Sequence, residues 1–205
     1  MNVILQADSA LLTKTGNQEI GMTYKIWTNK VDNDFDFTEA KVRDLEPLMG
    51  LNLTGGVSLS EKWPKITMDV ISDYEPADSF LCGPMLIVSK KLSSVLFEFA
   101  LKDEIEYLPV DVVFNGKLQR EYGFLNVLLF CDALDRNKSK FTDLNGTVDS
   151  IDRVCLDESL AKNKPIFLLD AIEWVICVNE LLAERIENGA FSGIALKSPS
   201  EWRPF

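Results

Sequence analysis

Two hydrophobic periods divide the chain into segments expected to form strands and segments expected to form helices. Short apolar or alternating runs bounded by Gly, Pro, Asn or Asp are typical of strands. The Asn115-Gly116 pair separates two such runs, and this dipeptide favours a tight hairpin turn. The runs occupy residues 2–7, 20–27, 68–71, 107–114, 122–130, 154–156, 166–169 and 191–196.

A helical period appears in three other places. The apolar positions of residues 92–99 follow the i, i+3, i+4, i+7 spacing of an amphipathic helix, and Ser89 stands where its N-cap belongs. Asn179 holds the matching place before a second helix, which we expect to end at Asn188-Gly189. A third, short helix is expected over residues 39–45.

The first two helices belong to segments of similar sequence. In each, an apolar run, a cap residue and a helix of about ten residues lead to a short strand. This similarity predicts an internal strand-helix-strand repeat, and a chance match remains an alternative. The matching residues are Ile87, Val88, Ser89, Leu92 and Leu96 in the first unit and Cys177, Val178, Asn179, Leu182 and Ile186 in the second.

Together these elements predict an α+β fold, in which a mixed or antiparallel sheet packs with a few amphipathic helices. A chain of 205 residues fits one domain spanning residues 1–205. A division of this domain into two lobes stays open, with a β-rich N-terminal lobe over residues 1–80 and a second lobe over residues 81–205.

Cysteine spacing and hydropathy indicate the compartment. The four cysteines are widely separated in sequence, which is typical of reduced, buried thiols. The strongest apolar run, residues 124–133, is about half as long as a bilayer requires. The first residues lack the basic region of a signal peptide. We therefore expect a cytoplasmic protein without a membrane partner.

The charge balance restricts the partners. There are 21 basic and 32 acidic residues, and the formal net charge is −11. Recognition of phosphates needs a basic surface, so nucleic acid is not the expected partner. A basic protein partner fits this charge, because opposite charges accelerate association. Alternatively, the acidity only keeps the protein in solution.

Most catalytic chemistry is missing from the sequence. The chain contains no histidine, which removes the usual triads and the commonest metal ligand. Asp132 and Asp135, with Arg136 beside them, are the best pair for acid and base catalysis, but they also fit the end of an element. Asp73, Glu75 and Asp78 lack the glycine and spacing of a calcium loop. We expect no cofactor, no metal and no enzyme activity.

Several blocks of residues in the second half of the chain form an ordered pattern. The blocks are Leu108-Pro109-Val110, Tyr122, Leu125-Asn126-Val127, Asp132-Ala133-Leu134-Asp135 and Ser139, flanked by Asp78, Leu86 to Ser89, Leu92, Leu156-Asp157, Pro165-Ile166-Phe167, Val178-Asn179, Leu182 and Gly193. This pattern resembles the family of bacterial immunity proteins that is numbered eleven among them. The central block is moderately specific, because its residues agree in both order and spacing.

The resemblance covers roughly residues 60–200 and therefore marks residues 81–205 as the immunity-like core. It implies a protein that binds and blocks a cognate toxin of a polymorphic toxin system. We expect this toxin to be basic. It transfers no catalytic residues. Asn179 departs from the pattern, since the family usually has a Val-Ser pair there.

An acidic surface with aromatic anchors is the predicted contact with the toxin. The densest acidic segments are residues 32–46 and 69–78. Trp63 and Trp202 are either exposed anchors or packed on the domain edge, whereas Trp174 lies in an apolar run and is expected in the core. The predicted contact residues are Asp32, Asp34, Phe35, Asp36, Trp63, Asp73, Tyr74, Glu75, Asp78 and Phe80.

Two other functions stay open. A structural or self-assembling scaffold would carry a large apolar interface with its own copies, and a homo-oligomer is compatible with the sequence. A carboxylate enzyme using Asp132 and Asp135 would place both side chains in one pocket and shift their pKa values apart.

Overall fold

The computed structural model describes residues 23–30 and 37–204. Within these residues the chain forms thirteen strands, two α-helices and one 3-10 turn. The α-helices are short, with seven residues in α1 (Lys90–Leu96) and nine in α2 (Glu180–Asn188). The protein is mostly β, so the prediction of an α+β fold with several amphipathic helices is wrong.

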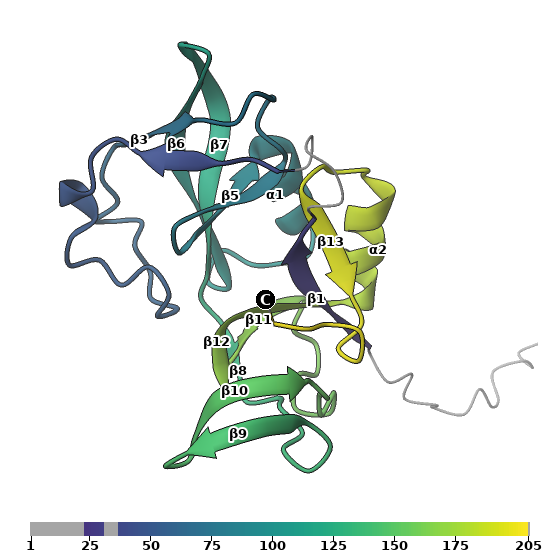
Figure 1. Cartoon of the computed structure of the whole chain (residues 1–205). Helices are drawn as coiled ribbons and strands as arrows, with labels where there is room; N and C mark the ends of the chain where they lie inside the picture. The colour runs from purple at the N-terminus through teal and green to yellow at the C-terminus, as the bar shows by residue number, and fades with distance from the viewer. Residues whose placement is uncertain (1–22, 31–36, 205) are drawn as a thin grey trace, which may run out of the picture.

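Six strands form a strongly curved sheet in the order β2-β3-β6-β7-β5-β4 (Figure 1). Only β3 and β6 run parallel, and the other neighbours are antiparallel. The two edge strands approach each other, because the Cys82 thiol donates to the Ala40 carbonyl at 3.4 Å. The sheet is therefore a nearly closed barrel around a core that includes Met68, Ile87 and Val112. The strands are β2 Ala40–Val42, β3 Ile66–Val70, β4 Ser79–Cys82, β5 Met85–Ser89, β6 Ile105–Phe114 and β7 Lys117–Val127.

The long β6–β7 hairpin confirms the turn predicted from Asn115-Gly116. Strand β6 ends at Phe114 and β7 begins at Lys117, so these two residues make the whole loop. Their φ angles are 49° and 72°. Two-residue loops with positive φ at both positions match the twist of the strands they join.

Five strands form a second sheet in the order β13-β1-β12-β11-β8, which lies to the right of the barrel and below it in Figure 1. Its only parallel pair is β11 with β8. One face covers a core around Phe167, Leu169 and Cys177, whose side chains are fully buried. The strands are β1 Tyr24–Asn29, β8 Phe130–Cys131, β11 Ile166–Leu169, β12 Ile172–Asn179 and β13 Ile194–Lys197.

The two helices join the sheets. Leu92 and Leu96 of α1 and Leu182 of α2 are fully buried in one core with Leu125 of β7 and Val178 of β12. On the outside, Arg185 forms an ion pair with Glu98 at 3.0 Å. A single apolar core therefore connects the barrel, the helices and the five-stranded sheet.

Both predicted N-caps are confirmed. The Ser89 hydroxyl accepts a hydrogen bond from the Leu92 amide at 3.1 Å, and the Asn179 side chain accepts one from the Leu182 amide at 2.9 Å. Each cap residue has an extended backbone, as an N-cap requires. Each helix therefore starts directly at the end of a strand.

The two strand-helix-strand units follow one pairing scheme. In the units β4-β5-α1-β6 and β11-β12-α2-β13, an antiparallel hairpin leads into a helix and then a strand. A further strand lies antiparallel between the second and last strands of each unit, β7 in the first and β1 in the second. The spatial orders β6-β7-β5-β4 and β13-β1-β12-β11 therefore agree. The order along the chain differs, because β7 comes after the first unit and β1 comes before the second.

A separate hairpin, β9 (Lys140–Leu144) and β10 (Thr147–Arg153), forms a two-stranded sheet at the bottom of Figure 1. Its turn is Asn145-Gly146, again with positive φ at both residues. Ile151 anchors the hairpin in the core of the five-stranded sheet. Sequence analysis did not predict this hairpin, because most of its side chains are exposed and give no apolar period.

Three local predictions are also wrong. Residues 39–45 contain strand β2 and then lead to a 3-10 turn, Glu46–Leu48, because Ala40–Val42 pairs with β3. The segment 154–156 contributes only an isolated bridge between Leu134 and Leu156. Trp174 is 55% exposed, although its apolar neighbours suggested a core position. The division into two lobes stays a prediction.

Candidate functional site

The acidic segment before β4 is an exposed loop. Asp73, Tyr74 and Glu75 are exposed, with Tyr74 at 37%. The loop is attached to the barrel at its next residue, because the Tyr122 hydroxyl donates to the Pro76 carbonyl at 2.9 Å. Burial, and then the nearby carboxylates of Asp78 and Glu75, raise the pKa of Tyr122. Two predicted acidic residues and one aromatic residue are thus accessible together.

Asp78 fixes the end of this loop. Its carboxylate accepts the Ser89 hydroxyl at 2.7 Å and the Ser192 amide at 3.1 Å. These bonds join strand β5 to the segment before β13. Phe80 is buried at 3% exposure and packs against Tyr122, with 5.8 Å between ring centroids. Asp78 and Phe80 therefore hold the end of the loop against the barrel and are not themselves exposed anchors.

Trp63 lies on the barrel and is half-buried. Its indole donates to the Pro109 carbonyl at 2.9 Å, and its ring packs on Phe124 with 5.5 Å between centroids. The alternative of packing on the domain edge therefore fits Trp63, and it fits Trp202, which is 3% exposed. Asp32, Asp34, Phe35 and Asp36 lie outside the described residues.

Asp132 and Asp135 have different surroundings. Asp132 is exposed, whereas Asp135 closes a turn by accepting the amides of Asn137 and Lys138, both at 3.1 Å. Asp135 also pairs with the Lys138 ammonium at 2.8 Å. This pairing, together with the backbone bonds, lowers the pKa of Asp135. Within residues 23–30 and 37–204, no three acidic or thiol groups lie close enough to hold a metal ion.

All four cysteines are free thiols, as the sequence predicts. Cys82, Cys131 and Cys177 are buried, while Cys155 is half-buried. Burial raises the pKa of the first three thiols, which keeps them protonated. Their surroundings are those of packing residues and not of reactive nucleophiles.

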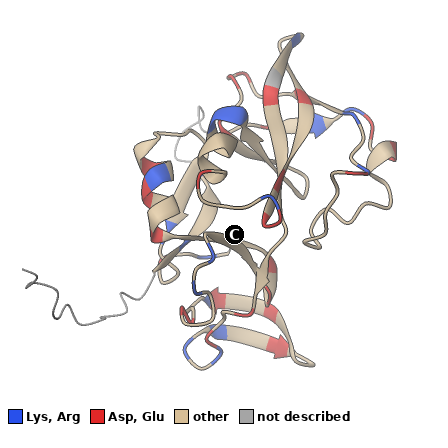
Figure 2. Cartoon of the chain, turned by 180° about the vertical axis from the view of Figure 1, so that it is seen from behind, with Lys and Arg blue, Asp and Glu red and all other residues tan. Residues whose placement is uncertain are grey.

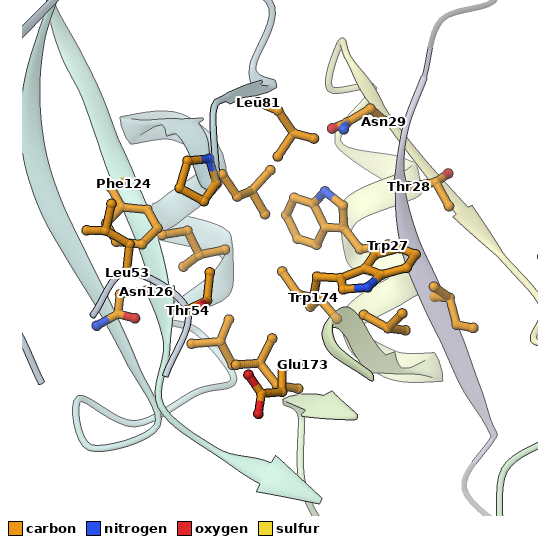
Figure 3. Close-up of a pocket in the computed structure, with 18 of the residues that line it drawn as sticks. Trp27, Thr28, Asn29, Leu53, Thr54, Leu81, Phe124, Asn126, Glu173 and Trp174 are labelled. Atoms are coloured by element: carbon orange, nitrogen blue, oxygen red, sulfur yellow. The ribbon is translucent and has the colours of Figure 1, made fainter. Parts of the chain in front are cut away.

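A cavity of about 430 Å³ lies between the barrel and the five-stranded sheet. Figure 3 shows Trp27 projecting into it from β1, with Phe124 and Asn126 of β7 on the opposite side. Large apolar side chains reach the surface at its rim, where Trp174 is 55% and Leu81 is 44% exposed. Its size is that of a ligand pocket, roughly 300–1,000 Å³.

No local sequence pattern predicted this cavity. Its walls come from segments more than one hundred residues apart, and apolar runs such as those of β1 and β12 look like ordinary core strands. The sequence signal that could have pointed to it is Trp27-Thr28-Asn29. In a strand Trp27 and Asn29 lie on the same face, so this face carries a polar residue next to a large aromatic one.

Among the residues that the structure describes, charged side chains do not gather on one element. Figure 2 shows Asp and Glu positions spread over both sheets and the β9–β10 hairpin, with Lys and Arg positions among them. Three exposed aspartates lie on the β9–β10 hairpin, namely Asp143, Asp149 and Asp152. The net charge of −11 therefore does not by itself identify a contact surface.

Comparison with families of known proteins matches residues 14–200 to the Immunity protein family (Imm11). The chain belongs to the Imm11 immunity protein family. The match includes the central block, residues 108–139, that resembled this family. Comparison with curated proteins finds no match.

Membership of Imm11 implies a toxin-neutralising, inhibitory role with a toxin as the partner. The arrangement of Asp135 as a turn residue agrees with such a role. In the part of the chain that the structure describes, no helix is long and apolar enough to cross a membrane.

Proposed function

We propose that this Imm11 protein neutralises a single basic toxin in the cytoplasm by binding it directly. The match to the immunity family over residues 14–200 carries this proposal. The exposed loop residues Asp73, Tyr74 and Glu75 are the proposed contact, and Asp32, Asp34, Phe35 and Asp36 are proposed to extend it. Asp78 and Phe80 support the contact through hydrogen bonds and packing, and half-buried Trp63 is proposed as a further contact residue on the barrel.

The geometry of the loop supports this choice. Asp78 binds Ser89 and Ser192, and Tyr122 binds the Pro76 carbonyl, so the base of the loop is fixed on two elements. A fixed loop loses little conformational freedom when a partner binds. An exposed tyrosine between two carboxylates offers an anchor and complementary charge at one place.

The excess of acidic residues supports a basic toxin. With 32 acidic and 21 basic residues, long-range attraction raises the rate of association with a cationic surface. At physiological ionic strength, salt screens the attraction between charges that are more than about 8–10 Å apart. The expected complex therefore forms faster at low salt and more slowly at high salt, with a smaller effect on its dissociation.

The test is a binding titration with the toxin encoded beside this chain, using a double charge reversal, Asp73→Lys with Glu75→Lys. Asp149→Lys with Asp152→Lys on the β9–β10 hairpin is the matched control, since it changes the net charge equally at exposed positions. We expect the loop variant to bind about tenfold or more weakly and the hairpin variant to change about threefold or less.

The outcomes separate the parts of the proposal. Equal weakening by both variants would replace the loop contact by a general effect of charge. Loss confined to the hairpin variant would move the interface to β9–β10. Wild-type protein that binds no toxin and sediments as a large self-assembly would favour the scaffold function.

A further inference from the structure

Two residues that line the cavity between the sheets each carry a buried polar atom without a partner among the described residues. Within the described residues, neither the Trp27 indole nitrogen nor the Asn29 side-chain oxygen has a hydrogen-bond partner. Both residues line the cavity, and Trp27 is only 7% exposed. They lie two residues apart on β1, so both side chains leave the strand on the same face.

This pair of atoms has a specific chemical complement. Buried polar atoms in native proteins are almost always hydrogen-bonded, and an indole nitrogen only donates. An extended peptide residue carries the matching acceptor and donor on one edge, because its own C=O and N–H point to the same side and can pair with the Trp27 indole N–H and the Asn29 oxygen respectively. Figure 3 shows the two side chains next to each other at one side of the cavity.

The rest of the cavity is suited to an apolar group. Leu86, Phe124 and Val127 are buried side chains of its wall. At about 430 Å³ the space is many times larger than a single water molecule needs. A water between Trp27 and Asn29 would leave most of this apolar wall uncovered.

The rim is open and aromatic. Trp174 of β12 and Leu81 of β4 are largely exposed, and they reach the cavity from different sheets. Exposed tryptophan at the edge of a pocket is typical of the residues that dominate protein interfaces. Glu173, Lys197 and Arg203 also line the cavity and are exposed, so its mouth offers both charges to a polar chain.

We propose that this cavity receives an apolar peptide segment of the bound toxin, in which the C=O and N–H of one extended residue pair with Trp27 and Asn29. The proposal rests on the proposed function, since the toxin supplies the segment. A peptide combines an amide with an adjacent apolar side chain, which is the combination that the two unpartnered atoms and the apolar wall require.

The first experiment uses N-acetyl-phenylalaninamide as a probe of the cavity. The four tryptophans give four indole N–H signals in a nitrogen-15 spectrum, and Trp27→Phe identifies the signal of Trp27. We expect the probe to move this signal saturably, with a dissociation constant of about 1 mM or below. The Trp63 indole already donates to Pro109 and is expected to stay in place.

Toluene and Asn29→Leu test the amide. Toluene fills apolar space without a hydrogen bond, and Asn29→Leu removes the acceptor at a half-buried position while keeping a similar volume. We expect Asn29→Leu to weaken binding of the probe about fivefold, the effect of one hydrogen bond, and to leave toluene unchanged. Equal effects on both ligands, or no movement of the Trp27 signal by the probe, would overturn the amide site.

The second experiment titrates the toxin into wild type, Trp27→Phe, Asn29→Leu and the control Leu144→Ala, which changes an exposed apolar position on the β9–β10 hairpin. Weaker binding by the two cavity variants alone, with competition by the probe, would support the proposal. Unchanged binding without competition would overturn the cavity as the seat of the toxin segment and leave the proposed function standing. A wild-type protein that binds no toxin would overturn the proposed function, while the probe titration would still report on the amide site.

Discussion

Asn126 donates its side-chain amide to the Glu106 carboxylate at 2.9 Å, and the two residues face each other across β6 and β7. The same carboxylate accepts the Ser58 hydroxyl at 2.5 Å, the Leu59 amide at 2.9 Å and the Ser60 amide at 3.3 Å. Asn126 also donates to the Val57 carbonyl. This pair therefore fastens the long 57–60 connection to the barrel.

Glu106→Gln should destabilise the fold. In the wild type these donors meet carboxylate oxygens, whereas in the variant the glutamine N–H group faces at least one of them. Glu106 is only 9% exposed, so that donor cannot turn to water. Leaving one buried donor unsatisfied costs about 1–3 kcal/mol. Urea unfolding of Glu106→Gln measures the loss, and Asp103→Asn at an exposed position is the control, with an expected change below about 0.5 kcal/mol.

The same variant should flatten part of the acid denaturation profile. Burial raises the pKa of Glu106, but the bonds from Leu59, Ser58, Asn126 and Ser60 outweigh it and hold the pKa below its ordinary value of 4.5. The contribution of Glu106 is therefore present above pH 4.5 and is lost as the pH falls through its lowered pKa. A profile of Glu106→Gln parallel to wild type below pH 4.5 would contradict this.

Gly193→Ala should disrupt the junction between the two sheets. Its φ is +74°, and an added Cβ would lie 2.0 Å from the Ser79 carbonyl oxygen and 2.7 Å from the Ala77 Cβ. Gly146 also has a positive φ, of 88°, but open space around it. We expect about 1–2 kcal/mol for Gly146→Ala from the backbone alone, and about 1–3 kcal/mol more for Gly193→Ala from the clash. Equal unfolding free energies would show that the junction can relax.

Elements with a local signal could be predicted from the sequence. Ser89 and Asn179 cap their helices because a side-chain acceptor next to an apolar period satisfies the first free amides. Asn115-Gly116 forms its hairpin because both residues tolerate positive φ. Each of these outcomes depends on a few neighbouring residues, so the sequence contains most of the cause.

Elements decided by distant partners could not be predicted. Ala40–Val42 has a helix-like context but pairs with β3, and Trp174 stands in an apolar strand but is 55% exposed. The acidic loop was found from composition, yet only its fold showed that Asp73 and Glu75 are exposed while Asp78 is bound by serines. The cavity depends on Trp27, Phe124 and Trp174 together, which no local pattern connects.

Cys155 should react first with a thiol reagent. It is half-buried, whereas Cys82, Cys131 and Cys177 are buried. For Cys177, burial and then the nearby Cys131 raise the pKa of the thiol, so the reactive thiolate is scarce. Brief treatment with iodoacetamide followed by peptide mass spectrometry should find Cys155 modified and the other three only after denaturant is added. Early modification of Cys177 would show that the core of the five-stranded sheet opens readily.

Asp135→Asn should weaken the 135–139 turn without affecting toxin neutralisation. The amide keeps an acceptor for the backbone of Asn137 and Lys138 but loses the ion pair with the Lys138 ammonium. That pair first, then the backbone bonds, lowers the pKa of Asp135 from 3.8, so its contribution exists above pH 3.8 and disappears below it. Thermal unfolding at pH 7 should show a slightly lower stability for the variant than for wild type. In 1 M salt this difference should disappear, because the Debye length shortens to about 3 Å. A folded Asp135→Asn protein that fails to neutralise the toxin would instead give this carboxylate a part in the activity and revive the enzyme hypothesis.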